Sequence, residues 1–355
     1  MASVAMNLAF LAMYIHRRYF GGGRSDNNGS GKEITTVEPS KGKPPVTADS
    51  VVNLDHGDPT LYWEFWLGTG DRATVVIPVW QTMSYFSDLT GFCWFVEPGF
   101  ERQVRRLHRL VGNAVVDGYH LLVGTGSTQL FQAALYALSP ADDGTPMSVV
   151  SSAPYYSSYP SVTNFLNSAL YRWDGDANTF AGDACIEVIC SPNNPDGGIR
   201  KGVVKSKSVK TIHDFAYCWP QYTPITEAPS HDIMLFTVSK CTGHAGTRLG
   251  WALVKDTEVA QKMIKFMELN TIGVSKDSQL RAAKIIKVVC DGYEQSPTSE
   301  ANRLFHFAQR KMAERWSRLR TVVAASGIFS LPDELSSYCT FAKQIVTANP
   351  RKHHI

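Results

Sequence analysis

The sequence predicts an α/β protein built on an open, mostly parallel sheet. From about residue 115, short apolar runs alternate with helical patterns, and these runs lack the strict alternation of a half-exposed strand. The connections between them are long enough for the crossovers that parallel strands require. The expected strands are YHLLV (119–123), MSVVS (147–151), ALYRW (169–173), CIEVIC (185–190), VKTIHDF (209–215), IMLFTV (233–238) and RLGWALV (248–254).

Helical patterns dominate the chain after Asp256. Residues 258–269 and 275–289 have helical spacing, and residues 299–325 form a longer helix with one apolar stripe. The stripe consists of Leu304, Phe307, Ala308, Met312, Trp316, Leu319 and Val323. We expect this helix to lead into a second, smaller α+β domain, to which residues 329–346 add a single strand.

Composition excludes several classes of protein. With 35 Lys+Arg against 32 Asp+Glu, the net charge is +3, so nothing in the charge points to nucleic acid. A chain that is 44% hydrophobic and 19% charged is neither a disordered polar segment nor a polytopic membrane protein. The seven cysteines are scattered without zinc-binding spacing, which predicts reduced thiols and no metal site.

Residues 1–20 predict a short N-terminal membrane anchor. Residues 2–15 carry no charge, and His16, Arg17 and Arg18 follow at once. Positive charge after the apolar run is the reverse of a secretory signal and would keep the rest of the chain in the cytosol. The run is shorter than the ~20 residues that span a bilayer, so an unanchored tail is the alternative. Residues 21–50, rich in Gly, Ser, Pro and Lys, predict a flexible linker.

Four polar clusters follow expected strands. They are Gly124–Thr128, Ser191–Gly197, His213–Tyr217 and Thr237–Lys240, and Arg248 lies eight residues beyond the last. Ligands in open α/β sheets bind at the carboxyl ends of strands. Singly, each cluster is typical of a turn or a helix cap. Together they are the parts of a pyridoxal-phosphate enzyme of the aspartate-aminotransferase type: a phosphate turn, an Asn-Pro turn, an acid for the pyridine nitrogen and a Schiff-base lysine.

The chain resembles the plant tryptophan aminotransferase family, which shares a superfamily with the alliinases. The resemblance covers roughly residues 51–340. Its blocks are NLDHGDPTLYWEFW, SYFSDLTGFCWFVEP, VGTGSTQLFQAALYALS, SPNNPDG, IHDFAYCWPQYTPI, HDIMLFTVSKCTGHAGTRLGWALVKD and GVSKDSQLRAAKI. It implies a fold type I large domain over 96–270 that binds pyridoxal 5′-phosphate, preceded by a substrate and interface arm over 51–95. Residues 271–355 would form the incomplete small α+β domain.

The resemblance also implies an activity and a location. The family converts L-tryptophan and a 2-oxo acid to indole-3-pyruvate, the first step of an auxin pathway. We therefore expect an aminotransferase, a homodimer, and a place at the endoplasmic reticulum membrane with the catalytic domain in the cytosol. A cytoplasmic protein is the alternative.

Four residues would carry the chemistry in this family. Lys240 would hold the cofactor as a Schiff base and, once displaced by substrate, would move the substrate α-proton. Asp214 would pair with the pyridine nitrogen. Tyr217 and Asn194 would reach the 3-oxygen of the ring.

Other residues would hold the phosphate group. Thr237 competes with Ser239 for a hydroxyl role, and Tyr85 resembles the tyrosine that relatives lend to the neighbouring subunit's phosphate. The expected phosphate ligands within one chain are Gly126, Ser127, Thr128, Ser239 and Arg248.

A further group would lie on the substrate side. Tyr156, rather than Tyr155, would stack on the cofactor ring. Gly57, Tyr62 and Asn194 would contact the substrate, within an aromatic arm that could equally serve interface packing.

One family feature has no counterpart here. Relatives clamp the substrate carboxylate with an arginine of the small domain. The residues after Thr340 run FAKQIVTANPRKHHI, and Arg351 does not sit in that motif. We expect a C-terminally shortened small domain, which leaves open a non-catalytic form that binds cofactor or dimerises with full-length relatives. An alliinase-like C–S lyase is the other alternative, although no Cys-rich segment precedes residue 51.

Overall fold

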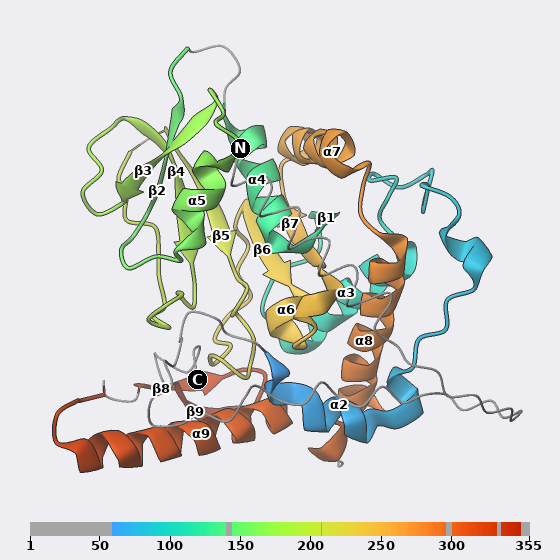
Figure 1. The fold of residues 1–355 in the computed structure, drawn as a ribbon, viewed down its shortest axis with the longest axis vertical. Coiled ribbons are helices and arrows are strands. Elements are labelled where there is room, and N and C mark those ends of the chain that lie inside the picture. Colours follow the sequence, from blue (N-terminus) through green and yellow to red (C-terminus); the bar gives the residue numbers. More distant parts are fainter. Residues whose placement is uncertain (1–58, 140–143, 207, 296–299, 332–334, 349–355) are drawn as a thin grey trace, which may run out of the picture. The chain divides into compact units, whose positions relative to one another are not determined.

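A mixed sheet forms the centre of the fold (Figure 1). The computed structural model describes residues 59–139, 144–206, 208–295, 300–331 and 335–348. The described strands of the sheet, in the spatial order β1-β7-β6-β5-β4-β2-β3, are β1 (His120–Gly124), β7 (Gly250–Val254), β6 (Ile233–Thr237), β5 (Ser208–Asp214), β4 (Ala184–Cys190), β2 (Met147–Ser151) and β3 (Tyr171–Asp176). β7 runs antiparallel to β1 and β6, and the other neighbouring pairs are parallel. The mostly parallel α/β sheet is therefore confirmed.

Helices cover both faces of this sheet. The helix α4 (Gly126–Leu138) packs on β6, β7 and α7 (Thr257–Thr271), whereas α3 (Pro98–Val111) packs on α8 (Lys276–Glu294). Short 3-10 helices lie near the start of the described chain: η1 (Thr60–Tyr62), η2 (Gly70–Ala73) and η3 (Val79–Thr82). The α-helices are α2 (Trp63–Thr69), α3 (Pro98–Val111), α4 (Gly126–Leu138), α5 (Ser158–Phe165), α6 (Val238–Cys241), α7 (Thr257–Thr271), α8 (Lys276–Glu294) and α9 (Leu304–Ser326).

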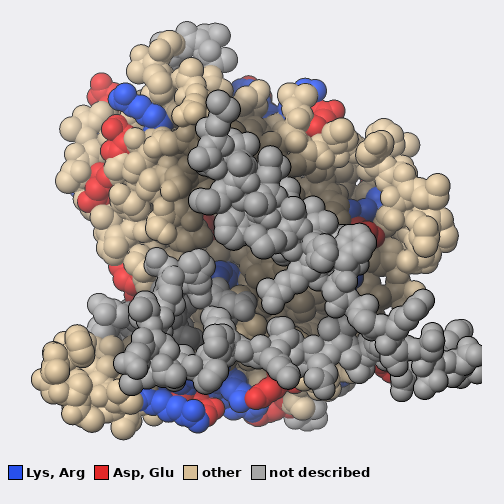
Figure 2. Space-filling model, viewed as in Figure 1, with Lys and Arg blue, Asp and Glu red and all other residues tan. Residues whose placement is uncertain are grey.

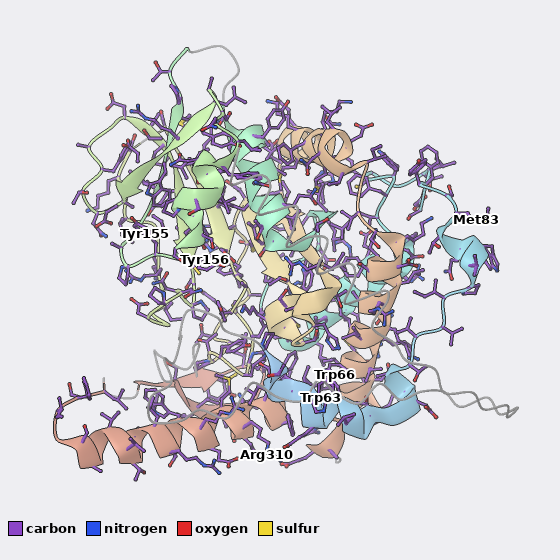
Figure 3. The ribbon with its side chains drawn as sticks, in the orientation of Figure 1. Trp63, Trp66, Met83, Tyr155, Tyr156 and Arg310 are labelled. Atoms are coloured by element: carbon purple, nitrogen blue, oxygen red, sulfur yellow. The ribbon has the colours of Figure 1, made fainter. Side chains whose placement is uncertain are left out.

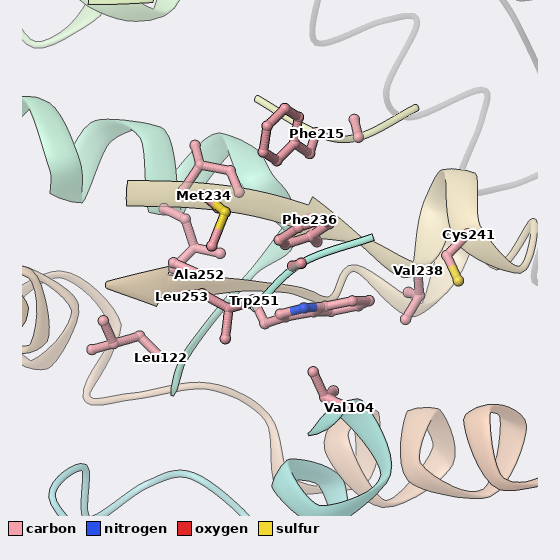
Figure 4. Close-up of a cluster of buried hydrophobic side chains, with 14 of the residues drawn as sticks. Val104, Leu122, Phe215, Met234, Phe236, Val238, Cys241, Trp251, Ala252 and Leu253 are labelled. Carbon is pink, nitrogen blue, oxygen red and sulfur yellow. The ribbon is translucent and has the colours of Figure 1, made fainter. Parts of the chain in front are cut away.

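Two successive residues of β7 show why the two faces differ. A Cβ atom on Gly250 would lie 2.7 Å from the Ser127 backbone nitrogen, so α4 can approach this closely only because the residue is glycine. Trp251 points to the opposite face, where its indole N–H donates to Nε2 of His108 in α3 at 2.9 Å. Its ring stacks on Phe236 of β6, with centroids 5.7 Å apart (Figure 4). Large aromatic side chains thus fill the side of the sheet that faces α3, whereas on the other side the backbone of α4 lies directly against β7.

Buried His108 makes stability depend on pH. Burial lowers its pKa to about 4, and its ring, which accepts from Trp251, contacts Asn113 through Nδ1 at 2.8 Å. Between pH ~6.5 and ~4 the unfolded chain binds this proton and the folded chain does not, so stability falls as pH falls through that window. We expect this residue alone to lower the unfolding free energy by on the order of 2–3 kcal/mol at pH 4 relative to pH 7.

Urea unfolding of the wild type and His108→Gln at a series of pH values measures this effect. The variant should be less stable at neutral pH but show a shallower loss on acidification. Parallel curves for the two proteins would contradict the assignment.

The long helix α9 is amphipathic, as its sequence indicates. Its buried side chains are Leu304, Phe305, Ala308, Met312 and Trp316. Charged side chains gather at the edge of the molecule formed by α9 (Figure 2), and Lys311 pairs with Glu64 of α2 at 2.8 Å. Exposed pairs of this kind stabilise by at most about 1 kcal/mol, so the apolar stripe holds α9 in place.

The expectation of a single strand after α9 is wrong. β8 (Leu335–Cys339) and β9 (Gln344–Ala348) form an antiparallel two-stranded sheet. The turn between them contains Lys343 in the left-handed region, at φ +53. Because hairpin turns usually carry Gly, Asn or Asp at such positions, the turn left no sign in the sequence.

Several predictions about chain organisation fall outside what the structure describes. The anchor over 1–20 and the linker over 21–50 lie outside the described residues. Among the described residues, no helix combines the length and the apolarity needed to cross a bilayer. The boundaries at residues 95 and 270 remain predictions.

Candidate active site

The polar clusters meet at one edge of the sheet because their strands run in the same direction. Cys190 at the end of β4 pairs in register with Asp214 at the end of β5. β6 ends at Thr237 and continues directly into α6, which carries Lys240. β1 leads through a turn into α4, with its glycine at position 126. The carboxyl ends of these strands therefore supply the candidate site.

Asp214 is a buried carboxylate held by two donors. The Tyr159 hydroxyl donates to its Oδ2 at 2.8 Å, and the Ala216 backbone N–H donates to its Oδ1 at 3.0 Å. Burial raises the pKa of Asp214, while these hydrogen bonds and the nearby positive charge of Lys240 oppose the rise. A cation facing this carboxylate would hold it ionised.

Lys240 lies beside the aromatic ring of Tyr217. Its side chain is half-buried, and Nζ sits 5.3 Å from the centroid of the Tyr217 ring. Burial raises the pKa of Tyr217 well above its ordinary value, and the nearby Cys190 and Asp214 add to the effect. Tyr217 therefore keeps its proton, and its ring face stabilises a nearby ammonium.

The turn before α4 meets Arg248. Gly126 has φ +75, and a Cβ atom there would lie 2.8 Å from Nη2 of Arg248. Arg248 is itself in the left-handed region at φ +51, and its Nη1 donates to the Ala245 carbonyl at 2.8 Å. Ser127 and Thr128 open the first turn of α4. A helix N-terminus beside a guanidinium is an arrangement that binds phosphate.

The two hydroxyls near Lys240 have different surroundings. Thr237 caps α6, because its Oγ1 accepts from the Ser239 N–H at 3.2 Å and lies 3.0 Å from the Ser239 hydroxyl. The same oxygen is 3.2 Å from the Leu249 carbonyl. Since Thr237 is committed to the cap, Ser239 is the better placed of the two for a ligand.

The two adjacent tyrosines after β2 diverge (Figure 3). Tyr155 packs edge-on against Trp173, with centroids 4.9 Å apart. Tyr156 packs edge-on against Tyr159, which holds Asp214, with centroids 5.5 Å apart. The structure thus brings Tyr156, and not Tyr155, toward the Asp214 side.

The remaining residues that the sequence predicted for the site lie in several different environments. Tyr85 is 70% exposed, in a segment that contributes nothing to the groups around Lys240 described above. Tyr62 is 2% exposed, and its hydroxyl contacts that of Tyr222 at 2.8 Å. Asn194 is half-buried in the turn after β4, and Gly57 lies outside the described residues. No metal-binding group of three or more His, Cys, Asp or Glu occurs in the described part of the chain.

Three residues at the site have no counterpart in the sequence prediction. Tyr159 holds Asp214, and the side chains of Gln221 and Tyr222 both donate to the Lys240 carbonyl at 3.2 Å. Tyr159 could have been found, since it is the third tyrosine of the segment APYYSSY that already supplied Tyr155 and Tyr156. Gln221 and Tyr222 bear no motif that points to a backbone carbonyl.

The fold is that of the fold type I aminotransferases. An aminotransferase from Staphylococcus aureus superposes with a TM-score of 0.51 at 13% identity, covering 90% of this chain and 93% of that one. A double mutant of Thermus thermophilus aspartate aminotransferase gives a TM-score of 0.52 at 17% identity, covering 73% and 68%. At these identities the likeness concerns the fold alone.

Sequence relatives define the family. The family model described as Allinase matches residues 52–353, and the chain belongs to the alliinase family. It is 68% identical to tryptophan aminotransferase-related protein 1 of Oryza sativa subsp. japonica, over 98% of this chain and 80% of that protein. It is 53% identical to tryptophan aminotransferase-related protein 2 of Arabidopsis thaliana, over 85% and 68%. Alliin lyase of Allium cepa var. aggregatum is 36% identical, over 83% and 67%.

Proposed function

We propose that this chain is a pyridoxal-phosphate-dependent aminotransferase that converts L-tryptophan and a 2-oxo acid to indole-3-pyruvate and the corresponding amino acid. The observation that carries the proposal is the arrangement of Lys240 and the buried Asp214 around Tyr217. The names of the rice and Arabidopsis relatives support tryptophan as the substrate.

The residues present fit this cofactor. Asp214 is a buried carboxylate suited to a protonated pyridine nitrogen, and an added Cβ at Gly126 would fill the space beside Arg248 where a phosphate would lie. When bound, pyridoxal phosphate supplies an electron sink for the carbanion left by the departing α-proton. Ser127, Thr128 and Ser239 add donors around the phosphate in this proposal.

The side chains at the site would then each have a distinct role in the reaction. Lys240 would anchor the cofactor and would afterwards take the proton from the substrate α-carbon at Nζ. Asp214, oriented by Tyr159, would keep a proton on the pyridine nitrogen. Tyr217 and Asn194 would help to hold the cofactor ring, and Tyr156 would cover it.

A product assay tests the proposal against its alternatives. Purified protein with pyridoxal phosphate, L-tryptophan and a panel of 2-oxo acids should yield indole-3-pyruvate, resolved by chromatography. A C–S lyase, favoured by the alliin lyase relative, would instead convert an S-alkylcysteine sulfoxide and water to a sulfenic acid, pyruvate and ammonia. Cofactor binding with no turnover of either substrate would indicate the non-catalytic form.

We also propose that the protein is a homodimer. Residues 73–87 contain no charged residue, and the segment leaves Val79, Trp80 and Met83 more than two-thirds exposed. Exposed apolar stretches of this size usually mark an interface. A second copy is the occupant that would bring Tyr85 to a neighbouring phosphate.

Trp80→Asp is expected to halve the molar mass in solution, because it places a charge in the proposed interface. Light scattering after size-exclusion chromatography measures the mass. Val322→Asp, at an exposed apolar residue of α9, is the matched control and should leave the mass unchanged. A wild-type monomer, or a Trp80→Asp protein with wild-type mass, would contradict the proposal.

A further inference from the structure

The helix that carries Lys240 is too short to satisfy its own carbonyls. α6 spans Val238–Cys241, and the last carbonyls of any helix need partners from outside it. The Lys240 carbonyl accepts from Gln221 Nε2 and from the Tyr222 hydroxyl, both at 3.2 Å. Gln221 Nε2 also reaches the Cys241 carbonyl at 3.1 Å. Side chains of one loop therefore hold the backbone from which the lysine extends.

A second layer supports this contact from the N-terminal arm. The Tyr62 hydroxyl lies 2.8 Å from the Tyr222 hydroxyl, and since Tyr222 donates to Lys240, Tyr62 donates to Tyr222. Burial raises the pKa of Tyr62 to about 12, so it keeps the proton that it donates. A Cβ atom at Gly243 would lie 2.4 Å from the Tyr62 ring, so glycine is what lets the ring sit against the end of α6.

The arm makes one more contact with the same helix end. Trp66 of α2 donates its indole N–H to the Thr242 carbonyl at 3.0 Å. The Tyr62, Gln221 and Tyr222 side chains are all buried. Buried donors that lose their partners are costly, so these bonds fix α6 firmly.

We infer that Gln221 and Tyr222, supported by Tyr62, are positioning residues that hold the Lys240 backbone so that its amine stays beside the Tyr217 ring and near Asp214. The inference rests on the proposed function, in which Lys240 is the reacting amine. The loop that begins at Asp214 and carries Tyr217 also carries both donors. One segment therefore positions Asp214, Tyr217 and Lys240 relative to one another.

This arrangement has a kinetic consequence. A lysine amine sits at the end of a flexible four-carbon chain, so a small shift of its backbone is enough to move it out of reach of the reacting atoms. Loss of geometry at a reacting group lowers kcat, whereas loss of a substrate contact raises KM. Tyr222→Phe is expected to lower kcat for L-tryptophan about tenfold or more with KM changed less than about twofold.

Tyr293→Phe is the matched control. Tyr293 is a partly buried tyrosine whose hydroxyl accepts from the Phe305 N–H at 3.0 Å, so this variant also removes a hydroxyl from inside the fold. Its kcat is expected to match that of the wild type. A Tyr222→Phe protein with unchanged kcat, or equal losses in both variants, would overturn the inference.

A second readout needs no cofactor. Acetylation of Lys240 by a small amine-reactive ester, followed by mass spectrometry of the cofactor-free chain, reports how well the amine is held. Loosening α6 exposes the amine, so Tyr222→Phe should be labelled faster than the wild type, and Tyr293→Phe at the wild-type rate. Equal labelling rates in all three proteins would contradict the inference.

If Tyr222→Phe does not fold, Tyr62→Phe replaces it, because this variant removes only the hydroxyl that donates to Tyr222. A smaller loss of kcat and a smaller rise in the labelling rate are expected, and no change in either would overturn the inference.

The proposed function and the positioning role can fail separately. Wild-type protein that forms no borohydride-reducible adduct between Lys240 and pyridoxal phosphate would overturn the proposed function. The acetylation comparison would still decide whether Gln221 and Tyr222 position Lys240.

Discussion

Lys240→Ala is expected to lower kcat for L-tryptophan transamination by about a thousandfold or more, because in the proposed function Lys240 is both the cofactor anchor and the general base. The visible absorbance of protein-bound pyridoxal phosphate should also disappear. Steady-state assays of indole-3-pyruvate formation and absorbance spectra measure the two effects. Lys240 is half-buried in α6, directly after the buried strand β6, a setting in which lysine is uncommon.

Lys255→Ala is the control for this variant. Lys255 is an exposed lysine that follows β7. Its loss should leave both rate and spectrum unchanged. Retention of activity in Lys240→Ala would contradict the assignment of Lys240, whereas equal loss in both variants would point to a general effect of removing positive charge.

Asp214→Asn is expected to lower kcat by about a hundredfold to a thousandfold, the scale for loss of a preorganised electrostatic partner. Asparagine keeps the size and can still accept from Tyr159, but it cannot hold a proton on a pyridine nitrogen. Tyr159→Phe should have a smaller effect in the same direction, since the carboxylate remains and only its orientation loosens. Single-turnover kinetics with L-tryptophan separates this loss from weaker cofactor binding.

The control for this series is Asp232→Asn, at an exposed aspartate. It should keep the wild-type rate. An Asp214→Asn protein with near-wild-type kcat would show that the carboxylate does not face the cofactor nitrogen. A Tyr159→Phe protein that loses more activity than Asp214→Asn would contradict the orienting role.

Apolar runs predicted the large sheet well because strands buried on both faces are nearly continuous in hydrophobicity. MSVVS coincides with β2, and the runs for β4, β5 and β6 match within a residue at each end. The hairpin of β8 and β9 was not predicted, because its turn places a lysine, and not glycine or asparagine, at positive φ. A lysine at positive φ is uncommon, so rules based on turn residues do not point to this hairpin.

The candidate site was predictable where function requires particular residue types at particular spacings. The structure brings Lys240 near Asp214 and Tyr217, and Gly126 near Arg248, whereas the roles assigned to these residues stay predictions. Gln221 and Tyr222 were missed because they act on backbone carbonyls, and any side chain with a donor can do so. Such roles depend on three-dimensional proximity and leave no pattern in the sequence.

The fate of the substrate nitrogen tests the central claim most directly. Purified protein would be supplied with pyridoxal phosphate, ¹⁵N-labelled L-tryptophan and an unlabelled 2-oxo acid, and the products analysed by mass spectrometry. Transamination predicts indole-3-pyruvate together with ¹⁵N in the amino acid made from the 2-oxo acid, and neither in Lys240→Ala. Recovery of the label as free ammonia, or only in unreacted tryptophan, would contradict the aminotransferase assignment.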